Sequence, residues 1–197
     1  MIQAGGRVRG RGPVGGRVLG IDCGSSKTGY GVIDVKGRAA QVVASGVILA
    51  SARLSFPERL KKIGDELGRL IETHSPDAVA VEEVFYSVNV KSALKLGQVR
   101  GVALFKAADA ALPVYEYSPL QIKSSVVGYG RADKNQVQQM VKILLSLKEL
   151  PLEDAADALA VALCHAHCAQ TQEKLASARS GRSSPGPAAR AAQSPRI

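Results

Sequence analysis

Two acidic residues of this sequence stand where short apolar runs end. Asp22 follows the run 18–21, and Glu82 follows the run 78–81. Both runs have the length and composition of buried strands. An acid just past a buried strand lies at a sheet end, which is where open α/β sheets bind their ligands. Asp22 and Glu82 are therefore candidate functional residues.

A second pair of acids, Asp154 and Asp157, lies in a segment with the pattern of a helix. Residues three positions apart share one face of a helix. The alanines around them, including Ala155, Ala156 and Ala158, allow another element to approach closely. If both pairs of acids meet, their repulsion would keep some of them protonated unless a cation binds. Because Mg²⁺ prefers carboxylate oxygen, the set predicts metal-assisted phosphoryl chemistry.

Each acid taken alone also has an ordinary explanation. Asp22 could be a turn residue, and Glu82 has an acidic neighbour, Glu83, so one of that pair could simply be solvated. Asp154 could cap a helix and Asp157 could be an exposed helical acid. The combination of four acids, rather than any one of them, carries the prediction.

The length and composition favour one domain with tails. The chain has 197 residues, of which 46% are hydrophobic, which is enough for a core. It contains neither an apolar run long enough to span a membrane nor the apolar region of a secretory signal. Three cysteines do not suggest a disulfide framework, so we expect a reducing, cytoplasmic setting.

The formal net charge of +9 is concentrated towards the ends of the chain. Residues 1–16 carry three arginines and no acid, and residues 170–197 carry five basic residues against one acid. Basic surface around a small acidic focus suits a polyanion bound through a metal, although the cationic ends could also serve only solubility. We predict a disordered basic Gly/Arg-rich extension at 1–15, one folded domain at 16–169 and a disordered basic tail at 170–197.

The pattern between the ends predicts an α/β fold. Three strands come first and form an antiparallel meander, and a helix with a capping box at Ser55 and Glu58 follows. Strands and helices then alternate. This order predicts a mixed five-stranded sheet flanked by helices, compatible with the ribonuclease H-like fold. The expected strands are 17–22, 28–35, 40–49, 78–82 and 114–117, and the later helices are 91–110, a short one after Pro119, 135–147 and 152–169.

With these residues in hand, the sequence resembles the RuvC family of Holliday-junction resolvases over about residues 17–168. Each matching segment is weak alone, and the five together, in the right order, are specific. The segments are Gly20-Ile21-Asp22-Cys23-Gly24-Ser25, Thr28-Gly29-Tyr30-Gly31-Val32-Ile33, Ser92-Ala93-Leu94-Lys95-Leu96-Gly97-Gln98, Val126-Val127-Gly128 and Asp154-Ala155-Ala156-Asp157-Ala158-Leu159-Ala160. One departure is Cys23, where many relatives are expected to have a proline that would only stiffen the turn.

The resemblance implies a homodimer that cuts four-way DNA junctions by paired symmetric nicks in homologous recombination and DNA repair. It implies two Mg²⁺ ions per subunit and a branch-migration complex of RuvA and RuvB as partner. The helix 91–110 could supply the dimer contact or an ordinary core face. The implied metal ligands and catalytic acids are Asp22, Glu82, Asp154 and Asp157, and the implied catalytic basic residues are Lys123 and Lys134.

The expected DNA contacts are the two lysines, Arg131 and Phe85. Phe85 lies three residues after Glu82 and beside Tyr86, where an aromatic side chain could stack on bases at a distorted crossover. It could equally be a core residue below the end of the sheet.

Three other readings remain at this point. A nuclease of the YqgF-like group has the same fold and acts on RNA, but the segments 92–98 and 154–160 favour the resolvase. The segment 22–29 is similar to the phosphate loop of actin-like ATPases and sugar kinases, which need a second domain. A junction-binding module without catalytic activity is the third, and the presence of all four acids argues against it.

Overall fold

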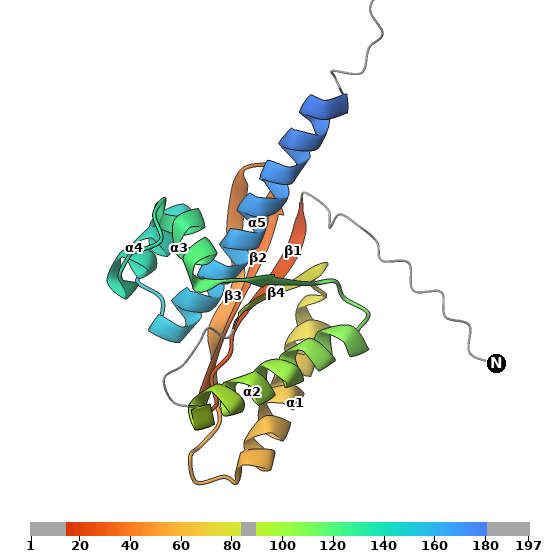
Figure 1. Cartoon of the computed structure of the whole chain (residues 1–197), viewed down its shortest axis with the longest axis vertical. Helices are drawn as coiled ribbons and strands as arrows, with labels where there is room; N and C mark the ends of the chain where they lie inside the picture. The colour runs from red at the N-terminus through yellow and green to blue at the C-terminus, as the bar shows by residue number, and fades with distance from the viewer. Residues whose placement is uncertain (1–14, 84–89, 181–197) are drawn as a thin grey trace, which may run out of the picture.

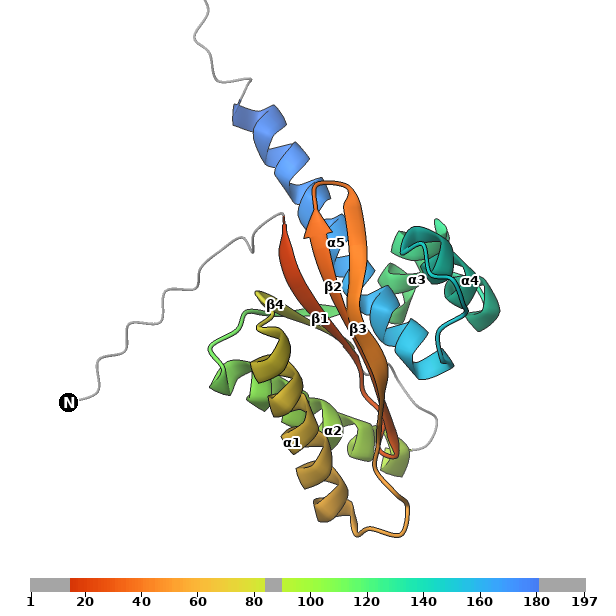
Figure 2. The same ribbon diagram turned by 180° about the vertical axis from the view of Figure 1, so that it is seen from behind.

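The computed structural model describes residues 15–83 and 90–180, which form one mixed sheet with helices on both faces (Figures 1 and 2). The five strands match the predicted ones to within a residue or two at each end. They are β1 Gly16–Asp22, β2 Lys27–Lys36, β3 Ala39–Leu49, β4 Ala78–Glu82 and β5 Val114–Tyr117.

The strand order in the sheet is β3-β2-β1-β4-β5. The first three strands form the predicted antiparallel meander, whereas β4 and β5 run parallel to β1. Strand β1 is therefore central, and its carboxyl end lies beside that of β4. This places the two strand-end acids on adjacent strands.

The helices lie in two groups. Helices α1 Phe56–His74 and α2 Val90–Asp109 cover one face of the sheet, and α5 Glu153–Ser180 crosses the other, with α3 Pro119–Val127 and α4 Lys134–Leu144 packed against it (Figures 1 and 2). Helix α1 begins as predicted, because the Glu58 carboxylate accepts a hydrogen bond from the Ser55 backbone N–H at 2.7 Å.

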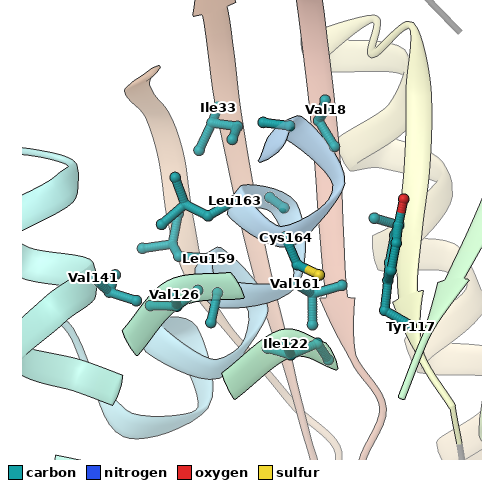
Figure 3. Close-up of a cluster of buried hydrophobic side chains, with 14 of the residues drawn as sticks. Val18, Ile33, Tyr117, Ile122, Val126, Val141, Leu159, Val161, Leu163 and Cys164 are labelled. Atoms are coloured by element: carbon teal, nitrogen blue, oxygen red, sulfur yellow. The ribbon is translucent and has the colours of Figure 1, made fainter. Parts of the chain in front are cut away.

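Alternation along the strands divides the core in two. In β1, Leu19 and Ile21 point to the α1 and α2 side, whereas Val18 points to the α5 side. Figure 3 shows the α5-side cluster, in which Leu159 and Leu163 of α5 lie between the sheet and the side chains of α3 and α4. By the same alternation, Asp22 and Glu82 belong to the α5 side of the sheet.

Glycines let α5 lie directly on the strands. A Cβ atom at Gly20 of β1 would lie 2.2 Å from the Ala158 carbonyl oxygen, and one at Gly29 of β2 would lie 1.9 Å from that of Asp154. Neither position can hold a side chain unless the helix moves away. The alanines of α5, such as Ala158, complete the close contact that their small size predicted.

Two predicted helix ends are wrong. Helix α4 ends at Leu144 rather than near residue 147, because the chain turns through Ser146, which has a φ of 51°. Helix α5 continues to Ser180 instead of ending near residue 169, so residues 170–180 of the predicted tail are helical. Good helix formers occupy this stretch, and the first glycine comes at Gly181. The remaining tail, 181–197, and residues 1–14 lie outside the described residues.

The outer edge of the sheet is β3, which has eleven residues and contains neither a charged residue nor a proline. Its pairing with β2 shifts register between Val32 and Ile33, opposite Val43. In the described parts of the chain, no helix combines the length and apolar character needed to cross a membrane.

Candidate active site

Asp22 and Glu82 lie side by side at the ends of β1 and β4. The register pairs Ile21 with Val81, so each acid is the next residue on its strand. Both side chains are half-buried, and a hydrogen bond joins their carboxyl groups. The two strand-end acids therefore lie together, and their role as metal ligands stays a prediction.

The first turns of α5 bring Asp154 and Asp157 near the Asp22 carboxyl group. Helix α5 begins at Glu153 over the start of β2, where Gly29 pairs with Asp22. Asp154 and Asp157 are half-buried, and their charges act on Asp22. The closeness of the helix to the sheet, which the glycines allow, thus brings Asp154 and Asp157 within electrostatic reach of Asp22.

Burial and mutual repulsion raise the pKa values of Asp22, Glu82 and Asp157. Burial is the main reason that the pKa of Asp22 rises to about 6, and the negative charge of Asp157 adds to it. The pKa of Glu82 rises to about 7, again mainly through burial and then through the charge of Asp22. Burial also raises the pKa of Asp157, while Lys134 opposes that shift. Near neutral pH, one proton is therefore shared in the hydrogen bond between Asp22 and Glu82.

The donor set has the chemistry of a magnesium site, because its oxygens are carboxylates that are crowded and partly desolvated. A divalent cation would replace the shared proton and relieve the repulsion. In residues 15–83 and 90–180, however, no three aspartate, glutamate, histidine or cysteine side chains are gathered closely enough to hold an ion. Asp22 and Glu82 turn towards each other, so coordination requires their side chains to reorient.

Lys134, the first residue of α4, reaches this group of acids. The Asp133 side chain accepts a hydrogen bond from the Gln136 backbone N–H at 2.9 Å, which caps the helix and places Lys134 at its start. The Lys134 Nζ lies 2.5 Å from Glu153 Oε1 and 3.9 Å from Asp157 Oδ2. Lys134 therefore lies at the site, as predicted, and Glu153 is an adjacent acid that sequence reasoning missed.

Lys123 lies on α3, half-buried, and its positive charge favours the ionised forms of Glu82 and Asp157.

Two histidines of α5 hold α5 against neighbouring elements. The His165 Nδ1 and the Tyr117 hydroxyl share a buried 2.8 Å hydrogen bond at the end of β5, and His167 Nδ1 lies 3.1 Å from Ser125 Oγ. His167 thus ties α3, which carries Lys123, to α5, whereas His165 ties α5 to β5.

The two remaining predicted DNA contacts have different outcomes. Arg131 is exposed in the turn between α3 and α4. Phe85 lies outside the described residues, in the gap 84–89 that separates Glu82 from α2. Its role as a stacking residue stays a prediction.

Comparison with known proteins identifies the family. The model of the RuvC family, described as crossover junction endodeoxyribonuclease RuvC, matches residues 18–165. A crossover junction endodeoxyribonuclease RuvC from Citrifermentans bemidjiense is 54% identical over 152 residues, which cover 77% of this chain and 93% of that protein. The protein of the same name from Geobacter sulfurreducens is 53% identical over 163 residues, covering 83% of this chain and 99% of the relative.

Solved structures agree with this assignment. The RuvC of Thermus thermophilus in complex with a Holliday junction substrate superimposes with a TM-score of 0.76 at 39% identity, covering 79% of this chain and 96% of that one. A second structure of Thermus thermophilus RuvC gives a TM-score of 0.73 at 38% identity, again over 79% of this chain and 96% of the other. The chain belongs to the RuvC family of crossover junction endodeoxyribonucleases, which are hydrolases with the ribonuclease H-like fold.

Proposed function

We propose that this protein is a Mg²⁺-dependent endonuclease that resolves four-way DNA junctions by paired symmetric nicks during recombination and repair. The observation that carries the proposal is the pairing of Asp22 and Glu82, with raised pKa values, within electrostatic reach of Asp154, Asp157 and two lysines. The relative from Thermus thermophilus is in complex with a Holliday junction, which supports the substrate class.

The four acids would hold two Mg²⁺ ions per subunit. When bound, Mg²⁺ supplies the positive charge that activates water and stabilises the leaving oxygen in phosphodiester hydrolysis. The burial that raises the pKa of Asp22 and Glu82 also limits their contact with water, which strengthens their attraction for a cation. Their shared proton must leave when metal binds, so metal affinity should increase with pH.

Lys123 and Lys134 would hold the phosphate that reacts. They approach from two different helices, and both act electrostatically on Asp157. A lysine aimed at the point where charge develops stabilises the transition state more than the ground state. Arg131, exposed in the turn between their helices, would contact the DNA backbone further from the site.

Helix α2 carries an apolar stripe suited to a homodimer. Leu94 and Phe105 are 63% and 64% exposed, and Gly97 and Gly101 between them face open space. These positions recur at helical spacing, and the glycines allow a partner helix to come close. Val99 on the opposite side is buried, so the helix provides both a core face and a free face. A two-fold dimer would present two active sites to the symmetric strands of a junction.

Beyond the dimer, we propose a cytoplasmic location and a branch-migration complex of RuvA and RuvB as partner. The support is membership of the family. Neither proposal depends on the geometry of the four acids, so each can fail while the proposed nuclease reaction stands.

Product mapping on a synthetic four-way junction, with and without Mg²⁺, tests the reaction. We expect symmetric nicks on opposite strands only with metal. Asp22→Asn, Glu82→Gln, Asp154→Asn and Asp157→Asn should each abolish cleavage and keep junction binding, because affinity comes from basic residues and shape. Full activity in any variant would remove that residue from the site.

Glu83→Gln provides the matched control, since Glu83 is the exposed neighbour of Glu82 and differs from it mainly in position. It should cleave at the wild-type rate.

For the dimer, Leu94→Glu should give a monomer in sedimentation, whereas Ile143→Glu, an equally exposed apolar position on α4, should not. A monomeric wild-type chain would refute the dimer.

A further inference from the structure

We infer that Glu153 is a positioning residue that holds the Lys134 ammonium beside Asp157. The inference rests on the proposed function, since it assigns Glu153 a task in that reaction. It starts from the contact between two helix starts, where Lys134 is the first residue of α4 and Glu153 the first residue of α5.

The geometry places the ammonium between two carboxylates. Lys134 Nζ lies 2.5 Å from Glu153 Oε1, a short charge-assisted hydrogen bond, and 3.9 Å from Asp157 Oδ2. Glu153 and Asp157 are four residues apart, so they share one face of α5. Glu153 therefore anchors Lys134 within one helical turn of a catalytic acid.

The backbone around this contact is already fixed, which leaves the lysine side chain as the variable part. Asp133 caps α4, and Gln138 Nε2 donates a 2.7 Å hydrogen bond to the Pro151 carbonyl just before α5. The side chain of Lys134 is nevertheless 68% exposed. A lysine stem that is free in water samples many rotamers, and a fixed partner removes that freedom before the substrate arrives.

Glu153 does not share the environment of the four acids. Its side chain is 60% exposed and is paired with Lys134, whereas Asp22 and Glu82 are half-buried. An exposed carboxylate that is already paired orients the lysine without competing strongly for metal. Its negative charge also repels DNA phosphates. Glu153 should thus favour cleavage and slightly oppose binding.

The opposite effects expected on cleavage rate and on DNA affinity can be measured separately. Glu153→Gln keeps the size of the side chain and removes the charge. In the full-length protein, single-turnover cleavage of a four-way junction at saturating enzyme should slow by about two- to fivefold, the range expected of one exposed ion pair. The Kd for the junction should stay equal or fall. Glu149→Gln, the same change at an exposed acid in the loop before α5, should leave the rate unchanged.

A double-mutant cycle shows whether Glu153 acts through Lys134. In a Lys134→Ala background, Glu153→Gln should have no further effect on the rate. The Lys134 pKa, followed by NMR of the ammonium group, should be lower in Glu153→Gln than in the wild type, because the carboxylate raises it.

Several results would overturn the inference. An equal loss in both backgrounds would show that Glu153 acts independently of Lys134, and a shifted Mg²⁺ dependence would make Glu153 a metal ligand. An unchanged rate, in an active protein that needs Lys134, would also refute it. A wild-type chain that leaves junctions intact would instead overturn the proposed function on which the inference rests.

Discussion

The sharpest test of how the acids are placed is Gly29→Ala. The added Cβ atom would lie 1.9 Å from the Asp154 carbonyl oxygen, whereas ordinary contact begins at 3.4 Å. The start of α5 must therefore move by about 1.5 Å away from β2, because the obstacle on both sides is backbone. Overpacking of this kind costs about 1–3 kcal/mol of folding free energy.

The effect on cleavage should be larger than the effect on stability. A misplacement of about 1 Å at a reacting centre can lower a rate roughly 100-fold, and Asp154 is carried on the turn that moves. We expect a cooperative urea transition at a lower midpoint, an unchanged junction Kd, and a single-turnover rate about 100-fold lower.

Gly68→Ala on α1 is the control, because its Cβ atom would meet only the end of the Lys106 side chain, at 3.7 Å and beyond. It should be neutral or stabilising, since alanine favours a helix more than glycine does. A Gly29→Ala protein that cleaves at the wild-type rate would refute the argument that the close contact between α5 and β2 places Asp154.

Two further predictions concern the same site, and a third concerns the C-terminal tail. Lys123→Ala and Lys134→Ala should each lower the single-turnover rate more than junction affinity, and a change in Kd alone would reassign them to general binding. The pKa values of Asp22 and Glu82, about 6 and 7, lie above their ordinary values of 3.8 and 4.5. Between the ordinary and the raised values the folded state therefore binds more protons than the unfolded state. The free energy of unfolding should then fall as pH rises from 3.8 to about 7. Urea titrations should show that Glu82→Gln flattens this slope and that Mg²⁺ stabilises the wild type more at high pH than at low pH. Residues 181–197 contain three arginines, so their removal should make the junction Kd less dependent on salt without loss of cleavage. An unchanged salt slope would contradict this prediction.

The sequence allowed the strands and the four acids to be predicted because both depend on local patterns. Asp22 and Glu82 each follow a buried apolar run, and such runs form neighbouring strands in an α/β sheet. Alternation along β1 and β4 then puts both acids on one face. The glycines of the family segments 20–25 and 28–33, such as Gly20 and Gly29, form the contact surface for α5.

The remaining features depend on contacts between segments that are distant in the chain. The Lys134–Glu153 ion pair joins two helix starts, and neither residue's neighbours indicate it. The buried Tyr117–His165 hydrogen bond likewise could not be inferred from a histidine on an apolar helix. The composition of 170–197 as a whole predicts disorder, but the first eleven of these residues lack glycine and proline and continue α5.

The exposed edge of β3 has a consequence for the protein in concentrated solution. A long edge strand offers free N–H and C=O groups to any other strand, and proteins commonly protect such edges with charge or proline. β3 has neither, and only its register shift beside Val43 interrupts a flat pairing surface. Within the described residues, the protection that remains is repulsion between whole molecules, which the net charge of +9 supplies at low salt. Because salt screens that repulsion, self-association through β3 should increase with ionic strength, and DNA, which neutralises the same charge, should promote it when the protein is in excess.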